Sequence, residues 1–319
     1  MKTDYTKPIL STKEHIKLLK SRNLIINNYK FAENILNNVN YYNLSGYLYV
    51  FEDKSNSNLR THNFTDVNFE EVFEFFKIDT KIRHLLLSCI FYIEVYMKNI
   101  ISKTFTEIYK DAFYNYNIPN NIYKKINMEM EILANNSKEL FILHYKEKYN
   151  DFPKLPIWMS VEIMSLGILS KFYLFSEKRY KEEVAKKMCL NHYKYLEKLL
   201  HSIMIIRNKC AHHSRLLCIS LNKLKFPKQN KEKLNCNYNI RLLKQDTLFN
   251  FIVNLEYFIN KVPICLKNTM PLLKEIYKEL YKLNQLNSVK NKSYISNEIG
   301  IIDGWNGKEF SNRNLKIAT

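Results

Sequence analysis

Glycine and proline are scarce in this sequence of 319 residues, which contains five of the first and seven of the second. Sandwiches and barrels of β-strands need many tight turns, and these two residues shape most such turns. Their scarcity argues against those folds and for long uninterrupted helices. Because 46% of the residues are hydrophobic and the chain is long enough to bury a sizeable core, we expect a folded all-α protein.

The sequence also lacks paired cysteines, an apolar leader and a long apolar run. Its six cysteines are scattered without a C-x-x-C pair, which is typical of reduced thiols in a cytoplasm. The first ten residues are polar, unlike a signal peptide. The strongest apolar run, 85–97, is interrupted by Glu94 and is shorter than a membrane span. We therefore expect a soluble cytoplasmic protein without membrane association.

Acidic residues are few relative to basic ones. The 49 lysines and arginines against 31 aspartates and glutamates give a net charge of +18. A field of this sign attracts polyanions, among which nucleic acid is the most abundant. Codon bias in an A·T-rich genome would also raise the lysine content, but it would not require the acidic residues to lag so far behind. RNA is therefore the leading partner, ahead of a membrane surface or the ribosome.

Local patterns predict where the helices lie. Ser11 and Glu14 have the spacing of a capping box, so a helix should begin there and end near Arg22. Asn68 with Glu71 predicts the start of a second, much longer helix that reaches about residue 109. Apolar periodicity predicts further helices over 30–36, 122–134, 138–149, 157–175, 191–213, 246–261 and 271–286, with a loop over 53–63.

These helices predict one compact unit with three regions. Residues 1–68 form an N-terminal helical region, 69–286 form the helical core, and 287–319 form a polar C-terminal tail. Because the tail still contains apolar residues such as Trp305, we expect it to dock on the body. Arg83 and Glu94 lie within an apolar helix, where burial requires a partner, so we expect each to pair with other charges or with helix ends.

The heptapeptide Arg207-Asn208-Lys209-Cys210-Ala211-His212-His213 closes the predicted helix over 191–213. Asn208 and His212 are four residues apart and share a face. Arg207 lies one position further round, and its side chain is long enough to reach the same spot. The partial negative charge of a helix C-terminus favours cations there. The pattern therefore predicts that an imidazole and a guanidinium meet on one small surface.

Two other interpretations of this heptapeptide remain open. In the first, Arg207 caps the carbonyls of its own helix and His212 is a hydrogen-bonded core histidine, as would be common in an arbitrary helical protein. In the second, Cys210, His212 and His213 bind zinc, although no second ligand pair with suitable spacing occurs elsewhere in the sequence.

The spacing Arg207-x4-His212 resembles the signature of HEPN ribonucleases, and the surrounding chain resembles the Abi family of bacterial abortive-infection proteins. The blocks that carry the second resemblance are Lys7-Pro8, 15–22, the tyrosine-rich box 40–47, Asp79-x-x-x-Arg83 with Ile93-Glu94, Pro156-Ile157-Trp158 with Glu162, and Leu166-Gly167. For Tyr41, Tyr42 and Tyr47 of the box we expect packing between helices rather than stacking on RNA bases.

The sequence departs from the family pattern at two places. Many relatives have glycine after the arginine that ends the first block, whereas this chain has Asn23, a residue that also tolerates a left-handed helix end. Relatives often follow the histidine block with Arg, Leu, an aromatic residue and Asn, whereas here Arg215-Leu216-Leu217 continues into Cys218-Ile219.

The resemblance implies a helical bundle of HEPN type, with additional N-terminal helices and the docked tail. It further implies a metal-independent endoribonuclease toxin of an abortive-infection or toxin–antitoxin system, which needs no cofactor. The catalytic residues would be Arg207, Asn208 and His212. His213 is a possible supporting residue, and so is Glu162, which could orient His212, pair with Arg207 or simply pair with another cation. The residues expected to contact RNA are Lys209, Arg215, Lys223, Lys225, Lys228 and Lys231.

Family behaviour also implies partners for this chain. Two signatures would meet across the two-fold axis of a homodimer, and an adjacent protein or a non-coding RNA would act as the antitoxin that restrains the toxin. The alternative function is a basic RNA-binding scaffold that does not cut RNA.

Overall fold

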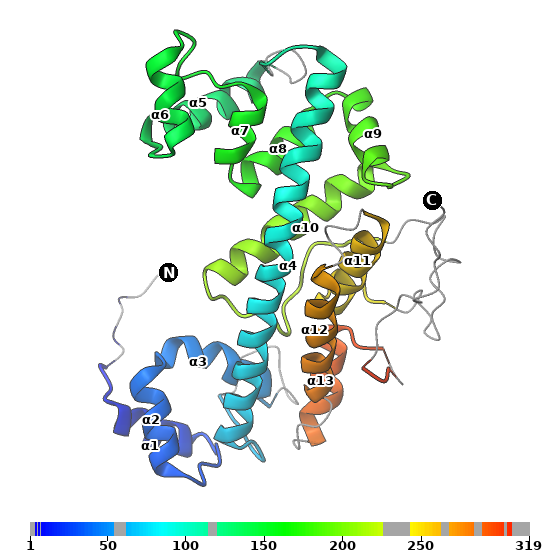
Figure 1. The fold of residues 1–319 in the computed structure, drawn as a ribbon. Coiled ribbons are helices and arrows are strands. Elements are labelled where there is room, and N and C mark those ends of the chain that lie inside the picture. Colours follow the sequence, from blue (N-terminus) through cyan, green and yellow to red (C-terminus); the bar gives the residue numbers. More distant parts are fainter. Residues whose placement is uncertain are drawn as a thin grey trace.

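The computed structural model describes residues 4, 6, 8–53, 62–113, 120–225, 243–262, 268–283, 289–302 and 305–307. Within these residues the chain forms helices and one isolated bridge but no strand, which confirms the predicted all-α fold (Figure 1). The helices are, in order, α1 Thr12–Ser21, α2 Tyr29–Asn38, α3 Tyr41–Leu48, the 3-10 turn η1 Tyr49–Phe51, α4 Phe69–Tyr109, α5 Asn120–Asn136, α6 Leu140–Lys148, α7 Ile157–Ile163, α8 Leu166–Phe175, α9 Lys178–Lys187, α10 Tyr193–Ala211, α11 Leu248–Lys261, α12 Met270–Lys282 and α13 Val289–Ile299.

Helix α4 is the axis of the molecule. It begins at the predicted capping box, in which the Asn68 and Glu71 side chains bond each other's backbone, and it continues for 41 residues. Figure 1 shows it running through the whole fold, with α1–α3 at one end, α7–α9 at the other and α10 crossing its middle. It packs against α3, α7, α8, α9, α10 and α12. Most of the fold is therefore assembled on this one helix.

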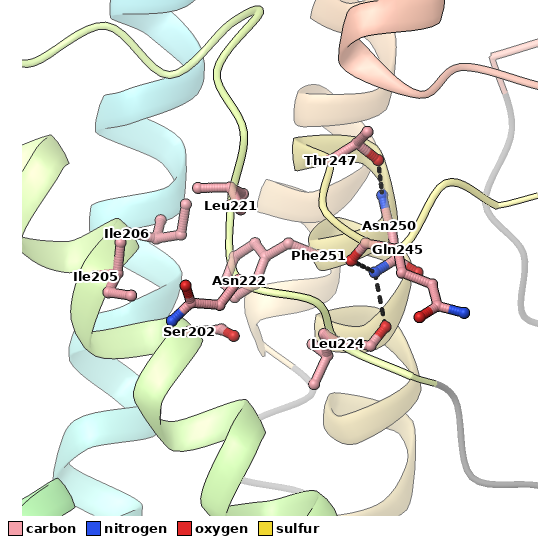
Figure 2. Close-up of a pocket in the computed structure, with 10 residues that line it drawn as sticks. All are labelled: Ser202, Ile205, Ile206, Leu221, Asn222, Leu224, Gln245, Thr247, Asn250 and Phe251. Atoms are coloured by element: carbon pink, nitrogen blue, oxygen red, sulfur yellow. Dashed lines mark hydrogen bonds between the residues drawn. The ribbon is translucent and has the colours of Figure 1, made fainter.

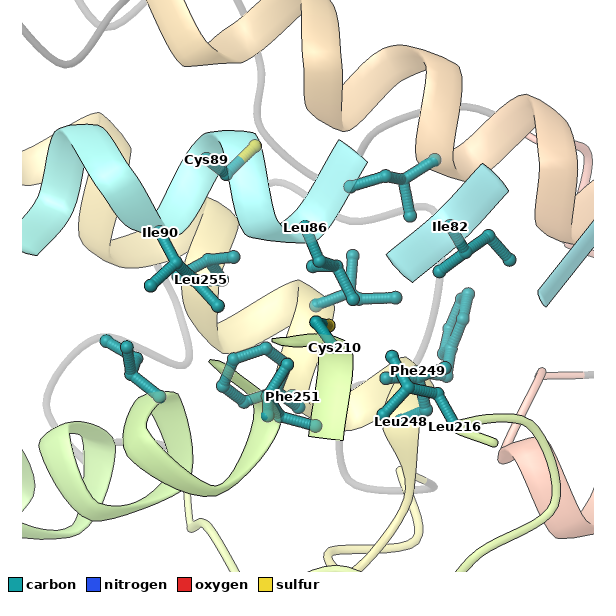
Figure 3. Packing of buried hydrophobic residues seen from close by; sticks show 14 of the residues in the cluster. Ile82, Leu86, Cys89, Ile90, Cys210, Leu216, Leu248, Phe249, Phe251 and Leu255 are labelled. Atoms are coloured by element: carbon teal, nitrogen blue, oxygen red, sulfur yellow. The ribbon is translucent and has the colours of Figure 1, made fainter. Parts of the chain in front are cut away.

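Length and composition alone would allow α4 to cross a membrane, because an 18-residue window of it has a mean hydropathy of 1.4. The sequence predicted no membrane span, because Glu94 interrupts the run 85–97. However, Ile82, Leu86 and Ile90 are buried against other helices. Figure 3 shows them packed beside Cys210 of α10 and Leu255 of α11. Because 44% of that window is buried and Phe91, Tyr92 and Val95 are exposed, α4 packs in the core along one face only.

The N-terminal region begins as its sequence predicts. Ser11 and Glu14 form a capping box at the start of α1. At the other end of α1, Asn23 adopts a left-handed conformation with φ of 64°, and the Leu24 N–H donates to the Leu19 carbonyl at 3.1 Å. Asparagine therefore occupies the left-handed position that glycine commonly takes after a helix.

Helix α3 lies within the tyrosine-rich box, for which no helix was predicted. Tyr47 is buried and Tyr41 stacks on His15 at 4.1 Å between ring centroids, as the packing interpretation requires. Tyr42 is 84% exposed, so for this residue the packing interpretation is wrong. The reason is its place on the helix: it lies on the opposite side of α3 from Tyr47.

The predicted helix over 157–175 is wrong as a single element. The chain forms α7 and α8, separated by Met164 and Ser165 in extended conformations. The Ser165 hydroxyl accepts a hydrogen bond from the Ile168 N–H at 3.2 Å and so caps the start of α8. The short helix α9 follows and was not predicted from the sequence.

Helix α13 lies in the region that was predicted as a polar tail. Ile299 and Trp305 are buried, and the Trp305 ring makes an edge contact with Phe249 of α11 at 4.9 Å between centroids. Described residues of all three predicted regions contribute to one hydrophobic cluster. The core therefore extends from α1 to beyond α13.

Leu86→Ala should lower the free energy of unfolding by about 2–5 kcal/mol, because it removes a fully buried side chain from the centre of α4. Val95→Ala is the matched control on the same helix, since Val95 is 70% exposed, and it should change stability by less than about 0.5 kcal/mol. Urea unfolding followed by circular dichroism measures both. Equal losses would contradict the assignment of α4 as the core helix.

Candidate active site at the end of helix α10

Helix α10 ends in a hydrogen-bonded C-terminal cap. Leu199, Ile203, Ile206 and Cys210 bury one face of the helix, whereas Asn208 and His212 remain exposed. His212 is the C-cap, and His213 adopts a left-handed conformation with φ of 55°. The Ser214 N–H donates to the Lys209 carbonyl at 2.9 Å, and the His213 N–H donates to the Cys210 carbonyl at 3.2 Å. This is a Schellman motif with histidine in the position that usually holds glycine.

Arg207 and Asn208 are in contact, although weakly. A guanidinium nitrogen of Arg207, Nη1, lies 3.5 Å from Asn208 Oδ1, and Asn208 Nδ2 lies 3.4 Å from Met204 Sδ. The Arg207 side chain is half-buried, and His212 is exposed. Within the described part of the chain, the His212 imidazole makes no hydrogen bond. Among the described residues the Arg207 guanidinium thus bonds Asn208 and makes no hydrogen bond to His212.

The Arg207 Nε atom is buried and has no hydrogen-bond partner among the described residues. A buried donor left unsatisfied costs about 1–3 kcal/mol, so native proteins rarely keep one. His212 is exposed, so it is not a core histidine. Among the described residues the Arg207 side chain bonds Asn208 Oδ1 rather than a carbonyl of its own helix.

Zinc binding by Cys210, His212 and His213 is not supported by the geometry. Among the described residues, no group of three or more His, Cys, Asp or Glu side chains is placed to hold a metal ion. The Cys210 thiol packs in the core near Leu86 and Leu216 (Figure 3). His212 and His213 are both exposed. The three groups therefore do not form one ligand set.

Asp79 of α4 is the buried polar centre behind this helix end. Its side chain is fully buried, and its Oδ1 accepts the backbone N–H groups of Leu216 and Leu217 at 2.9 and 2.8 Å. Its Oδ2 accepts the Tyr47 hydroxyl at 2.8 Å and Arg83 Nε at 2.9 Å. Burial, and after it the Asp79 charge, raise the pKa of the Tyr47 phenol, which therefore stays protonated and donates.

Sequence reasoning predicted only part of this cluster. The expectation that Arg83 and Glu94 pair with charges is confirmed, since Arg83 bonds Asp79 and the Glu94 carboxylate lies 3.7 Å from Lys98 Nζ. The expectation came from burial and named no partner, although the spacing of Asp79 and Arg83, four residues apart on one helix, could have identified this pair. No local signal connects Asp79 with Leu216, which is 137 residues away.

The basic residues expected to contact RNA lie at different depths. Lys209 and Arg215 are half-buried, and Arg215 Nη1 is buried without a hydrogen-bond partner among the described residues. Lys223 and Lys225 are exposed. Lys228 and Lys231 lie outside the described residues.

A hollow beside α10 is bordered by the segment that carries Lys223 and Lys225. Figure 2 shows Ile205 and Ile206 of α10 facing Asn222 and the Phe251 ring. The Asn250 side chain donates to the carbonyls of Leu224 and Gln245 at 2.9 Å each, which fixes the segment to α11. The two lysines are therefore held in place alongside the helix of the signature. The hollow is lined by Ser202, Ile205, Ile206, Leu221, Asn222, Leu224, Gln245, Thr247, Asn250 and Phe251.

Glu162 lies on α7, which packs on α4 and α5. Its side chain is exposed, and its backbone carbonyl accepts a hydrogen bond from Lys98 Nζ at 2.9 Å. The structure thus brings Glu162 to the α7 end of α4, whereas α10 crosses the middle of α4 (Figure 1).

Comparison with known proteins found one family. The family model described as Abi-like protein matches residues 34–217, which include α3, Asp79, Arg83 and the whole of α10. No match was found among curated proteins or among solved structures.

His213→Gly should raise the free energy of unfolding by about 0.5–1 kcal/mol. The left-handed conformation of His213 is strained because the residue has a Cβ atom. Removing that strain should outweigh the extra conformational entropy that glycine gives to the unfolded chain. Cys189→Gly is the matched control, since Cys189 has φ of 54° and closes α9 in the same way. Chemical denaturation of the two variants should give similar gains. A loss of stability for His213→Gly alone would mean that its imidazole makes a stabilising contact.

Proposed function

Because the chain belongs to the Abi-like family, which is associated with abortive infection and so with phage defence, we propose that it is a metal-independent endoribonuclease toxin. The observation that carries this proposal is the end of α10. There an exposed imidazole and an arginine with an unsatisfied Nε lie within one turn and a half of helix, inside the segment that matches the family.

The chemistry of RNA cleavage requires those two group types. A base removes the proton of a 2′-hydroxyl, whose oxygen attacks phosphorus; the bond to the 5′-oxygen breaks, and an acid gives that oxygen a proton. The products are a 2′,3′-cyclic phosphate and a free 5′-hydroxyl. Histidine can serve as base or acid near neutral pH, and the guanidinium fork matches the phosphate oxygens. In this proposal His212 transfers protons and Arg207 binds the phosphate. Asn208 orients either the imidazole or the phosphate.

Helix geometry favours a site built from two chains. Residues five apart on an ideal helix are separated by about 140° around the axis and by about 7.5 Å along it, so Arg207 and His212 of one chain point in different directions. One signature provides one arginine and one histidine. A homodimer that joins two α10 ends across a two-fold axis would bring Arg207 of one chain to His212 of its partner.

The proposed toxin would have RNA and an antitoxin as partners, and two further residues could support its site. The net charge of +18 supports RNA as substrate, and a toxin of this kind needs restraint by an antitoxin, either a protein or a non-coding RNA. Such a toxin would act in the cytoplasm. His213 remains a candidate supporting residue because it is exposed next to His212. Glu162 is a weaker candidate because it lies on α7, at the end of α4, whereas α10 crosses the middle of α4.

Arg207→Ala and His212→Ala should each abolish cleavage of labelled RNA in the presence of EDTA, because each removes a group that the reaction requires. The thermal unfolding midpoint should stay nearly unchanged, since neither side chain belongs to the hydrophobic core. The matched control is His201→Ala, an exposed histidine on the same helix that should cut like the wild type. Cyclic-phosphate ends on the products identify the reaction. Cleavage by either Arg207→Ala or His212→Ala would refute the assigned site.

A basic RNA-binding scaffold is the second candidate function. The net charge of +18 and the exposed Lys223 and Lys225 favour it, because basic groups can hold phosphates without an arginine–histidine pair. The same assay separates the two candidates. Tight RNA binding without any cleavage by the wild-type protein would support the scaffold.

Replacing both Lys223 and Lys225 by alanine should reduce the salt dependence of RNA binding under either function. Each phosphate contact to single-stranded RNA contributes about 0.7 to the slope of log affinity against log salt, so the double variant should lose about 1.4. Replacing Lys146 and Lys148 on α6 changes the net charge equally and should leave the slope unchanged. Fluorescence anisotropy titrations over a range of salt concentrations measure the slope. Equal slopes for the two double variants would contradict a role of the 221–225 segment in binding phosphates.

A further inference from the structure

Asp79 connects three parts of the chain that are remote in sequence. The Asp79 carboxylate accepts hydrogen bonds from Tyr47 of α3 and from Arg83, one turn further along α4. It also accepts the backbone N–H groups of Leu216 and Leu217. Arg83 also donates to the Thr80 hydroxyl at 2.8 Å, which fixes the guanidinium on α4. Both oxygens of the carboxylate therefore accept two hydrogen bonds each, and its orientation is fully determined.

The two backbone bonds fix the path of the chain immediately after His212. Only three residues separate His212 from Leu216, and the Schellman closure by Ser214 lies within that stretch. Leu216 and Leu217 are themselves fully buried. The His212 backbone is thus held by the helix on one side and by the bonded segment 216–217 on the other.

We propose that Asp79 is a positioning residue for RNA cleavage: its bonds to the Leu216 and Leu217 amides hold the end of α10 in the geometry that presents His212. This inference rests on the proposed ribonuclease function and adds a buried residue that would not touch RNA. Positioning groups of this kind commonly change activity by about 10- to 100-fold when they are altered, because a small displacement of a reacting group is costly.

A second buried tyrosine–carboxylate bond supplies a matched control. The Tyr277 hydroxyl donates to Glu256 Oε2 at 2.7 Å, between α12 and α11. Tyr47 and Tyr277 are both buried, and each donates one phenol O–H to a buried carboxylate. Tyr47→Phe and Tyr277→Phe should therefore lower the thermal midpoint to a similar, small extent. Only Tyr47→Phe frees the Asp79 carboxylate to rotate away from the Leu216 and Leu217 amides.

Single-turnover cleavage and amide hydrogen exchange test the proposal. Tyr47→Phe should lower the cleavage rate at saturating RNA by about 10-fold with KM unchanged within about twofold, and Asp79→Asn by about 100-fold. Exchange of the peptide that covers 212–217 should be faster in both variants. Tyr277→Phe should cut at the wild-type rate with unchanged exchange in that peptide. If Tyr47→Phe keeps the wild-type rate, or if Tyr277→Phe loses as much rate as Tyr47→Phe does, the positioning role is wrong.

Failure of the proposed function would give a different result. If Arg207→Ala and His212→Ala still cut RNA, the site itself is misassigned. If those variants are inactive while Tyr47→Phe and a folded Asp79→Asn cut like the wild type, only the positioning role is overturned. Should Asp79→Asn fail to fold because Arg83 loses its counter-charge, the Tyr47→Phe and Tyr277→Phe pair decides the matter.

Discussion

A buried carboxylate imposes the main constraint on this fold. A charge taken out of water is stable only if it is paired and fully hydrogen-bonded, and Asp79 meets that requirement with one guanidinium, one phenol and two backbone amides. Those groups come from α3, α4 and the segment after α10. Moving any of the three away would leave the charge under-solvated, so the N-terminal helices and the signature helix are fixed relative to each other.

The two faces of α10 differ at this end of the helix. The inner face of α10 is packed tightly, with Cys210 and Leu216 between α4 and α11 (Figure 3). The outer face of the same helix end has a strained His213, an Arg207 Nε without a partner and an exposed His212. Unfavourable local features concentrated on one small surface are typical of functional sites, and the well-packed inner face offsets their cost.

Much of this structure could be predicted from local sequence patterns. Capping boxes predicted where α1 and α4 begin, and apolar periodicity predicted α10, because both signals come from residues within a few turns of one another. The break between α7 and α8 was missed because apolar residues continue on both sides of Ser165, and its capping role is visible only in the backbone geometry. The heptapeptide indicated the candidate site, whereas the bonds from Asp79 to Leu216 and Leu217 depend on tertiary packing that no local pattern encodes.

We propose that Arg207 of one chain and His212 of its partner act together on one phosphate, because residues five apart on an ideal helix are separated by about 140°. Mixing the Arg207→Ala and His212→Ala proteins under conditions that allow subunits to exchange tests it most directly. A mixed dimer keeps one intact arginine and one intact histidine, contributed by different chains, so cleavage of labelled RNA should reappear in the mixture. If mixed dimers form and the mixture remains as inactive as either variant alone, the two residues do not share a composite site.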